Sequence, residues 1–123
     1  MTSATKMIRA MKKLLTTTAF LLIALASVSS GQNMPDFEET KALAEQGDRS
    51  AQFNLGMKYL IGEGVPRNPV RGYVWFSVAA AQGYEPAGDM RDTIATKILT
   101  REELSRGRDI ATRCFESNFQ DCE

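Results

Sequence analysis

The chain has 123 residues, 43% of them hydrophobic, which is room for one globular domain once any processed segment is removed. Fifteen basic and fifteen acidic side chains give a formal net charge of zero, so the composition lacks the basic excess of a nucleic-acid-binding protein. The absence of histidine excludes Ser-His-Asp and Cys-His catalytic sites and His-ligated zinc.

The first 30 residues have the layout of a secretory signal peptide. Basic side chains and no acidic one precede an apolar stretch over residues 14–28, and small residues follow it. This stretch is shorter than the about 20 apolar residues that a membrane-spanning helix needs, which favours a cleaved signal over an uncleaved anchor. Cleavage after Ser29, Ser30 or Gly31 would fit the pattern, and we take Ser30 as the boundary.

Removal of residues 1–30 leaves a mature chain, 31–123, that keeps 11 of the 15 basic residues and all 15 acidic ones, a net charge of −4. No cysteine directly follows the apolar stretch, so a bacterial lipid anchor has no attachment point. We therefore expect soluble export without a stable membrane anchor. The expected location is the periplasm of a Gram-negative bacterium, or outside the cell.

Two helices are predicted in the first part of the mature chain. Asp36 is an N-cap candidate with Glu39 three residues later, as in a capping box, and this helix should stop at Gly47. Asp48 offers a fresh cap for a second helix that runs to about Ile61 with apolar residues at helical spacing.

A Gly- and Pro-rich connector, residues 62–69, separates the second helix from a third. Asn68 followed by Pro69 is a strong helix start, because proline in the first turn loses no hydrogen bond. This third helix should end at Gly83.

Two further helices follow. Pro86 can open a fourth helix, on which one apolar stripe forms. Thr100 and Glu103 form a second capping box, which starts a fifth helix. We expect Leu104, Arg108, Ala111 and Phe115 to share one face of that helix. Because no segment alternates with period two, the predicted fold class is all-α.

The chain repeats itself at an offset of 36 residues, a spacing typical of one helix–turn–helix unit. The matched pairs are Ala44 with Ala80, Gln46 with Gln82, Gly47 with Gly83, and Ala51 with Ala87. Small residues recur because helices stacked in a solenoid approach each other closely.

Residues 42–87, ALAEQGDRSAQFNLGMKYLIGEGVPRNPVRGYVWFSVAAAQGYEPA, resemble the Sel-one-like repeat family, a branch of the tetratricopeptide-like helical repeats. The resemblance rests on Ala-Gln-x-x-Leu-Gly-x-x-Tyr, the Gly-x-Gly-Val connector and the closing Ala-Ala-x-x-Gly. It implies a short right-handed α-solenoid of antiparallel helix pairs, about five helices in all. It also implies an adaptor role, in which the first helices of the repeats line a concave face.

The resemblance divides the mature domain into one complete repeat, about 51–86, and a C-terminal half-repeat with a capping helix, 87–123. The later segment departs from the family pattern because no second Gly-x-Gly-Val follows. The family pattern also calls for alanine or another small residue near Gly72, and glycine there slightly weakens the helix.

Other residue types offer little chemistry. Adjacent acids such as Glu102 and Glu103 are typical of solvated or capping groups on exposed turns. The loop from Gly62 to Gly64 lacks the Lys-Ser/Thr of a phosphate-binding loop. We therefore expect no catalytic residues, no cofactor site and no metal site.

Cys114 and Cys122 are the only cysteines, and an even number in an exported chain predicts a disulfide. Residues eight apart on a continuous helix lie about 12 Å apart along its axis, so the helix must end near residues 117–118 and the tail must fold back. A redox-active pair is the alternative, but the Cys-x-x-Cys spacing is absent.

Seven residues are candidates for a protein-binding face, because they occupy outward positions on the second and fourth helices. They are Gln52, Asn54, Met57, Lys58, Arg91, Thr93 and Lys97. A solvated surface without a partner is the competing interpretation. The expected partner is an unidentified protein or peptide, with self-association also possible, and a structural role binding cell-wall polymer is the alternative function.

Overall fold

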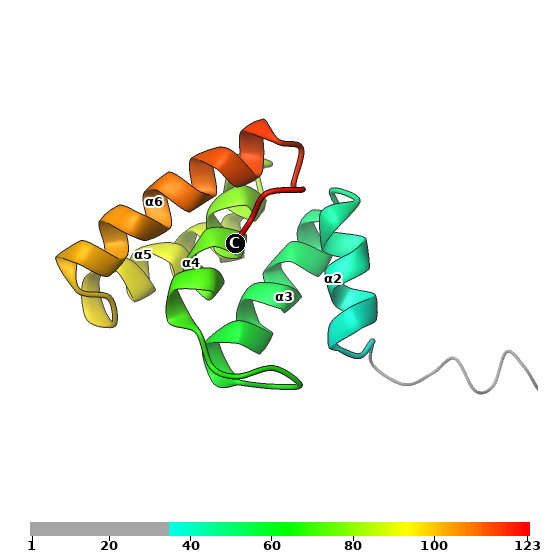
Figure 1. Cartoon of the computed structure of the whole chain (residues 1–123), viewed down its shortest axis with the longest axis horizontal. Helices are drawn as coiled ribbons and strands as arrows, with labels where there is room; N and C mark the ends of the chain where they lie inside the picture. Colours follow the sequence, from blue (N-terminus) through cyan, green and yellow to red (C-terminus); the bar gives the residue numbers. More distant parts are fainter. Residues whose placement is uncertain (1–34) are drawn as a thin grey trace, which may run out of the picture. The chain divides into compact units, whose positions relative to one another are not determined.

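A computed structural model describes residues 35–123, and these fold into five α-helices without a strand (Figure 1). The helices are α2 (Phe37–Glu45), α3 (Arg49–Ile61), α4 (Pro69–Ala81), α5 (Glu85–Lys97) and α6 (Arg101–Glu116). The prediction of an all-α fold with about five helices is confirmed. The predicted signal peptide, residues 1–30, lies outside the described residues.

Side-chain caps start most of the helices at the predicted positions. The Asp36 carboxylate accepts a hydrogen bond from the Glu39 N–H, and the Asn68 side chain accepts one from the Arg71 N–H. Thr100 and Glu103 form both bonds of a capping box. Each cap satisfies backbone donors that have no partner inside the helix.

The connector between α3 and α4 turns the chain through glycines with left-handed backbone. Gly62 ends α3 with a φ of 78°, and its N–H donates to the Lys58 carbonyl at 2.8 Å. Such a conformation is open to glycine at little cost. The Asn68 N–H then donates to the Tyr59 carbonyl at 2.7 Å, which brings the chain back alongside α3.

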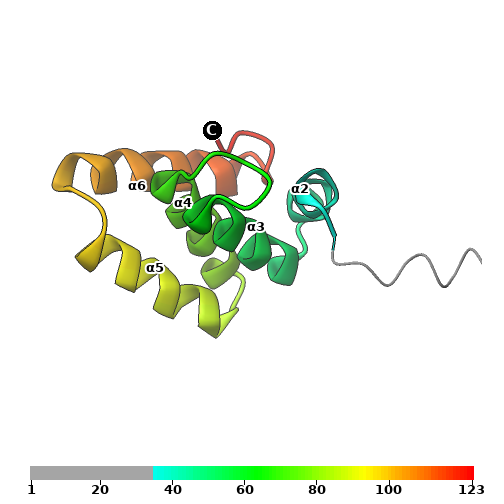
Figure 2. The same cartoon turned by 90° about the horizontal axis from the view of Figure 1, so that it is seen from below.

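The helices pack in sequence around α4, which contacts α3, α5 and α6, while α2 packs against α3. An Arg49 guanidinium N–H donates to the Gln82 carbonyl, so the first turn of α3 lies at the end of α4 and the two helices are antiparallel. Figure 2 shows α5 and α6 diverging from their connecting turn.

The approach of α3 to α4 depends on two glycines. A Cβ at Gly56 would lie 2.9 Å from the Phe76 ring, and a Cβ at Gly72 would lie 3.1 Å from the Gly56 carbonyl oxygen. Close approach therefore explains why glycine occupies position 72, where the sequence alone indicated only a weakened helix.

The predicted face of α6 is only partly buried. Arg108 and Phe115 are exposed, whereas Gly107 and Cys114 are the buried residues of this helix. The physical reason is the ring of Tyr73, which lies 2.9 Å from the position that a Cβ at Gly107 would take. A large residue of α4 thus presses into a gap that glycine leaves on α6.

Two clusters form the core. The first joins α2, α3, α4 and the C-terminal segment around Leu55, Tyr59 and Trp75. The second joins α3, α4 and α5 around Phe76 and Ile94. Tyr59 and Trp75 are 2% and 3% exposed, so both large rings lie within the first cluster.

Candidate protein-binding surface

Helices α3 and α5 present side chains around one core cluster on α4. Phe53 and Met57 of α3 and Met90 of α5 are half-buried and pack against the cluster that contains Phe76. Phe53 also contacts Tyr84 just before α5, with ring centroids 5.4 Å apart. Together these residues make a partly apolar surface, which we call the α3–α5 face.

Five of the seven predicted binding residues have accessible side chains. Asn54, Thr93 and Lys97 are exposed, while Met57 and Arg91 are half-buried. Arg91 Nε lies 2.9 Å from Asp92 Oδ1. Asn54 and Lys97 make no side-chain hydrogen bond or ion pair within residues 35–123, so both are available to a partner.

The predicted outward position of Gln52 is wrong, because this side chain is fully buried. Its Nε2 donates to the Ala44 carbonyl at 3.0 Å, and its Oε1 accepts from Gln82 Nε2. A buried amide is stable only when it is hydrogen-bonded. Gln52 therefore ties the last turn of α2 to the end of α4 and is part of the core.

The predicted outward position of Lys58 is also wrong. Only 8% of the residue is exposed, and Nζ lies 3.5 Å from Glu63 Oε1 in the connector. The aliphatic stem of a lysine can pack in apolar surroundings while its ammonium group reaches the surface. Lys58 therefore secures the turn after α3.

A cavity of about 530 Å³ lies where α5 and α6 diverge over α4. Arg91 lines it, together with Tyr73 from α4 and Arg108 and Thr112 from α6. The sequence did not identify Tyr73, Arg108 or Thr112 as residues of one site. No local pattern tells which side of α6 faces α4, so it could not bring residues of these two helices together.

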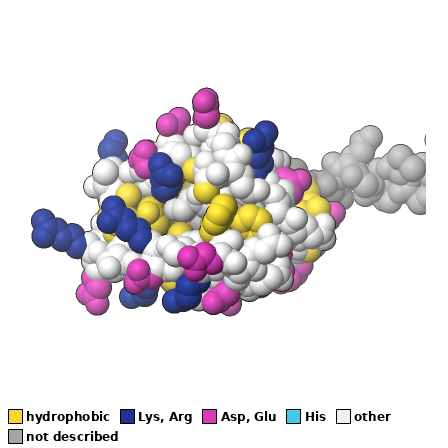
Figure 3. Space-filling model, turned by 90° about the horizontal axis from the view of Figure 1, so that it is seen from above, with side chains coloured by type: hydrophobic (Ala, Val, Ile, Leu, Met, Phe, Trp, Pro, Cys, Tyr) yellow, Lys and Arg dark blue, Asp and Glu magenta, His cyan; other side chains and the backbone are white. Residues whose placement is uncertain are grey.

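A hollow of about 290 Å³ adjoins this cavity along α4 and α6. Its lining is more apolar and includes Val78, Ala111 and the half-exposed Phe115. Figure 3 looks onto the α6 side of the molecule, and hydrophobic side chains gather near the middle of that face with charged groups around them.

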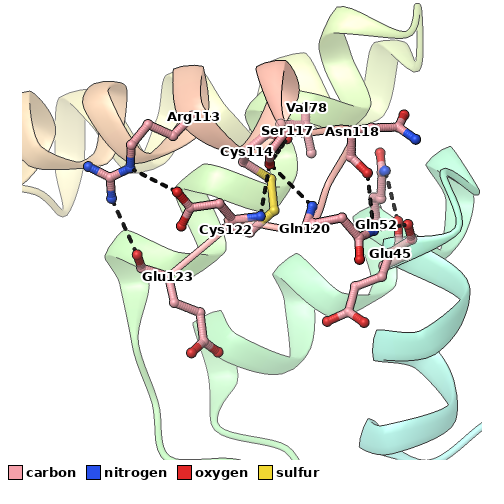
Figure 4. The surroundings of a disulfide bond; sticks show 12 residues. Glu45, Gln52, Val78, Arg113, Cys114, Ser117, Asn118, Gln120, Cys122 and Glu123 are labelled. Carbon is pink, nitrogen blue, oxygen red and sulfur yellow. Dashed lines mark hydrogen bonds and ion pairs between the residues drawn. A yellow bond between two sulfur atoms is a disulfide. The ribbon is translucent and has the colours of Figure 1, made fainter.

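The predicted disulfide is present between Cys114 and Cys122 (Figure 4). Helix α6 ends at Glu116, and the following residues turn back, as the eight-residue separation of the cysteines requires. Residues 119–123 of the returning chain line a cavity of about 270 Å³ on one side, and Tyr59 and Trp75 belong to the rest of its lining.

The chemistry of the described residues gives little sign of catalysis. No group of three or more Asp, Glu or Cys side chains that could hold a metal ion occurs between residues 35 and 123. Burial raises the pKa of the Tyr59 hydroxyl above its ordinary value of 10.0, and the nearby Arg71 partly opposes this effect.

Helices α3 and α4 form an antiparallel pair with further helices packed on either side, which is the arrangement expected of a tetratricopeptide-like helical repeat. More specifically, residues 49–84 match the family model of the Sel1 repeat, so the chain carries a Sel1 repeat that spans α3, α4 and the turn after them. Sel1 repeats typically mediate protein interactions and are usually non-catalytic.

No curated protein and no solved structure matches the chain. Within the described part of the chain, every helix is too short or too polar to cross a membrane.

Proposed function

We propose that the protein is an exported, non-catalytic adaptor or scaffold that holds another protein or a peptide on its α3–α5 face. Residues 1–30 act as a cleaved signal peptide, and residues 31–123 form the mature repeat domain in the periplasm or outside the cell. The disulfide supports export, because such bonds persist mainly in oxidising compartments. The Sel1 repeat supports a protein partner.

The observation that carries the proposal is the composition of the α3–α5 face. Half-buried Phe53, Met57 and Met90 offer adaptable apolar contacts. Exposed Asn54 follows Phe53 on α3, and exposed Lys97 lies about two helical turns beyond Met90 on α5. Apolar anchors with polar groups near them are a common means by which a protein surface binds a peptide.

Binding of cell-wall polymer is the alternative, and the burial of Tyr59 and Trp75 argues against it. Tyr59 and Trp75 have little exposed surface, so their ring faces are not free to stack on a sugar. A glycan surface would need such faces in contact with solvent, because amphipathic aromatic rings supply its contact area. A protein partner therefore fits the side chains better.

Crosslinking capture of the tagged protein in its native envelope, with mass spectrometry of the bound material, tests the proposal. We expect one dominant protein partner from the unaltered chain, and its loss from a variant with Asn54→Arg and Lys97→Glu. Both positions are exposed, so the fold should survive.

A matched control carries Glu38→Gln and Arg106→Glu, which change the net charge by the same amount at exposed positions of α2 and α6. The control should retain the partner. Recovery of wall polymer alone, or loss of the partner from both variants, would contradict binding at the α3–α5 face.

A further inference from the structure

The segment that follows α6, residues 117–123, folds back across the molecule, and we call it the tail (Figures 1 and 4). The disulfide joins Cys122 of the tail to Cys114 in the last turn of α6, and both cysteines are buried. The Phe119 N–H also donates to the Cys114 carbonyl at 2.7 Å. The disulfide holds the end of the tail against the last turn of α6, and this hydrogen bond holds the beginning of the tail there.

Three side chains of the tail reach α2 or the turn after it. Gln120 Nε2 donates to the Glu45 carbonyl at 3.1 Å, and Glu123 Oε1 lies 3.8 Å from Lys41 Nζ. The Phe119 ring lies 3.4 Å from the position that a Cβ at Gly47 would take. These contacts join residues about 75 positions apart in the chain. The tail therefore attaches α2, the first described helix, to the C-terminal end of the chain.

The tail is anchored to α4 and α6 at the same time. Glu123 Oε2 lies 3.8 Å from an Arg71 guanidinium nitrogen, and Arg113 pairs with Asp121 at 3.6 Å. Arg113 also donates to the Glu123 carbonyl at 3.3 Å. One short segment thus connects α2, α4 and α6.

The conformation of the tail is one that depends on its contacts. Asn118 and Phe119 have φ values of 56° and 67°, in the left-handed region that a bulky residue such as phenylalanine rarely adopts. Residues in such conformations persist only when the surrounding structure holds them there. The disulfide and the burial of Phe119, which is 8% exposed, supply that restraint.

Helix α2 has few other attachments. It has nine residues, which is too short to be stable alone in water, and among the helices it packs mainly against α3. Phe37 contacts Tyr59 edge-on, and Gln52 binds the Ala44 carbonyl. The connector reaches the start of α2, where a Cβ at Gly64 would lie 3.2 Å from Phe37 Cβ, so the tail is the surface besides α3 that holds the C-terminal half of α2.

We propose that the tail couples the redox state of the Cys114–Cys122 disulfide to the docking of α2. A dithiol reductant would break the Sγ–Sγ bond in a two-electron step, in which each cysteine sulfur gains a proton and the dithiol becomes a disulfide. The freed tail leaves its left-handed turn, and the C-terminal half of α2 loses the tail as a packing surface, while α3 to α6 keep their own contacts. This coupling is independent of which partner the protein binds.

Coupling of this kind is reciprocal, since each event must change the free energy of the other by the same amount. If the disulfide favours the docking of α2, then the contacts between the tail and α2 must make the disulfide harder to reduce. Reduction should therefore loosen α2, and loss of the contacts between the tail and α2 should make the disulfide easier to reduce. A disulfide that stabilised only the tail would produce neither effect.

The first test is hydrogen exchange of the oxidised and the dithiothreitol-reduced protein. We expect the amides of residues 37–45 to exchange about 5-fold faster or more after reduction, relative to those of residues 69–81. An unchanged rate at α2, or an equal increase in all helices, would overturn the proposal.

The second test leaves the disulfide intact and weakens the contacts between the tail and α2 with Gln120→Ala and Lys41→Met, which leave the Glu123–Arg71 pair in place. At equilibrium with dithiothreitol, this variant should be reduced about 5-fold more readily or more than the unaltered protein. Glu116→Gln is the control, because Glu116 is exposed on α6 and contacts neither α2 nor the tail through any hydrogen bond or ion pair of the described chain. Equal reduction of all three proteins would refute the coupling.

Discussion

At the scale of single residues, Gly56 sets the distance between α3 and α4. The position of an added Cβ is 2.9 to 3.0 Å from three atoms of the Phe76 ring, and Phe76 is fully buried. Because interiors are close-packed, such a ring has no free space into which it could move. Glycine is therefore required by packing at this position, in spite of its poor helix propensity.

We expect Gly56→Ala to lower the free energy of unfolding by about 1–2 kcal/mol, because overpacking costs up to about 3 kcal/mol and helix propensity returns only about 1 kcal/mol. Gly88→Ala in α5 is the matched control, since its Cβ would meet no atom closer than 3.8 Å. The control should be more stable than the unaltered protein by up to about 1 kcal/mol. Denaturant unfolding measures both, and a Gly56→Ala variant at least as stable as the unaltered protein would contradict the packing argument.

Gln52 and Lys58 show where sequence reasoning failed at this scale. Both occupy predicted outward positions of the second helix, and polar residues are seldom buried. The structure buries Gln52 because Ala44 and Gln82 satisfy its amide, and these partners lie on α2 and at the end of α4. Such partners come from tertiary packing, which a single helical pattern does not reveal.

At the scale of elements, the helix starts follow from local chemistry. The Thr100 hydroxyl accepts from the Glu103 N–H at 3.1 Å, and Glu103 Oε2 accepts from the Thr100 N–H at 2.9 Å. Both partners lie within four residues of each other, so the sequence alone predicts the box. The same holds for the caps at Asp36 and Asn68.

Removal of this capping box should weaken α6. We expect Thr100→Ala to lower the free energy of unfolding by about 1 kcal/mol, since the hydroxyl that accepts from the Glu103 N–H is lost, while the backbone N–H at position 100 can still donate to Glu103. Thr112→Ala, inside the same helix, is the control, because Thr112 bonds only to the Arg108 carbonyl and alanine favours a helix. Thermal unfolding distinguishes the two, and equal midpoints for both variants would show that the box does not stabilise α6.

The buried side of α6 was harder to predict than its start. Leu104 and Ala111 pack against the core as expected, but Phe115 is 50% exposed. The side that faces α4 is decided by Tyr73, which fits against Gly107. A glycine carries no hydrophobic pattern, so the sequence gives no indication of this contact.

At the scale of the whole molecule, the repeat predicted the stacking order, and the disulfide predicted the return of the chain after α6. The divergence of α5 from α6 and the contacts of the tail with α2 were not predictable. Both depend on contacts between residues far apart in sequence, such as Gln120 with Glu45. Of the seven candidate binding residues, Asn54, Met57, Arg91, Thr93 and Lys97 are accessible and Gln52 and Lys58 are buried, and a binding role for the accessible five stays a prediction.

The measurement that tests the central claim most directly is photocrosslinking in the native envelope from single positions on the molecule. A photoreactive residue at position 54 or 97 should crosslink to one and the same protein, because both positions flank the α3–α5 face. The same residue at position 38 or 106 should give little or none of that product. Equal crosslinking from all four positions, or from 38 and 106 alone, would contradict the account.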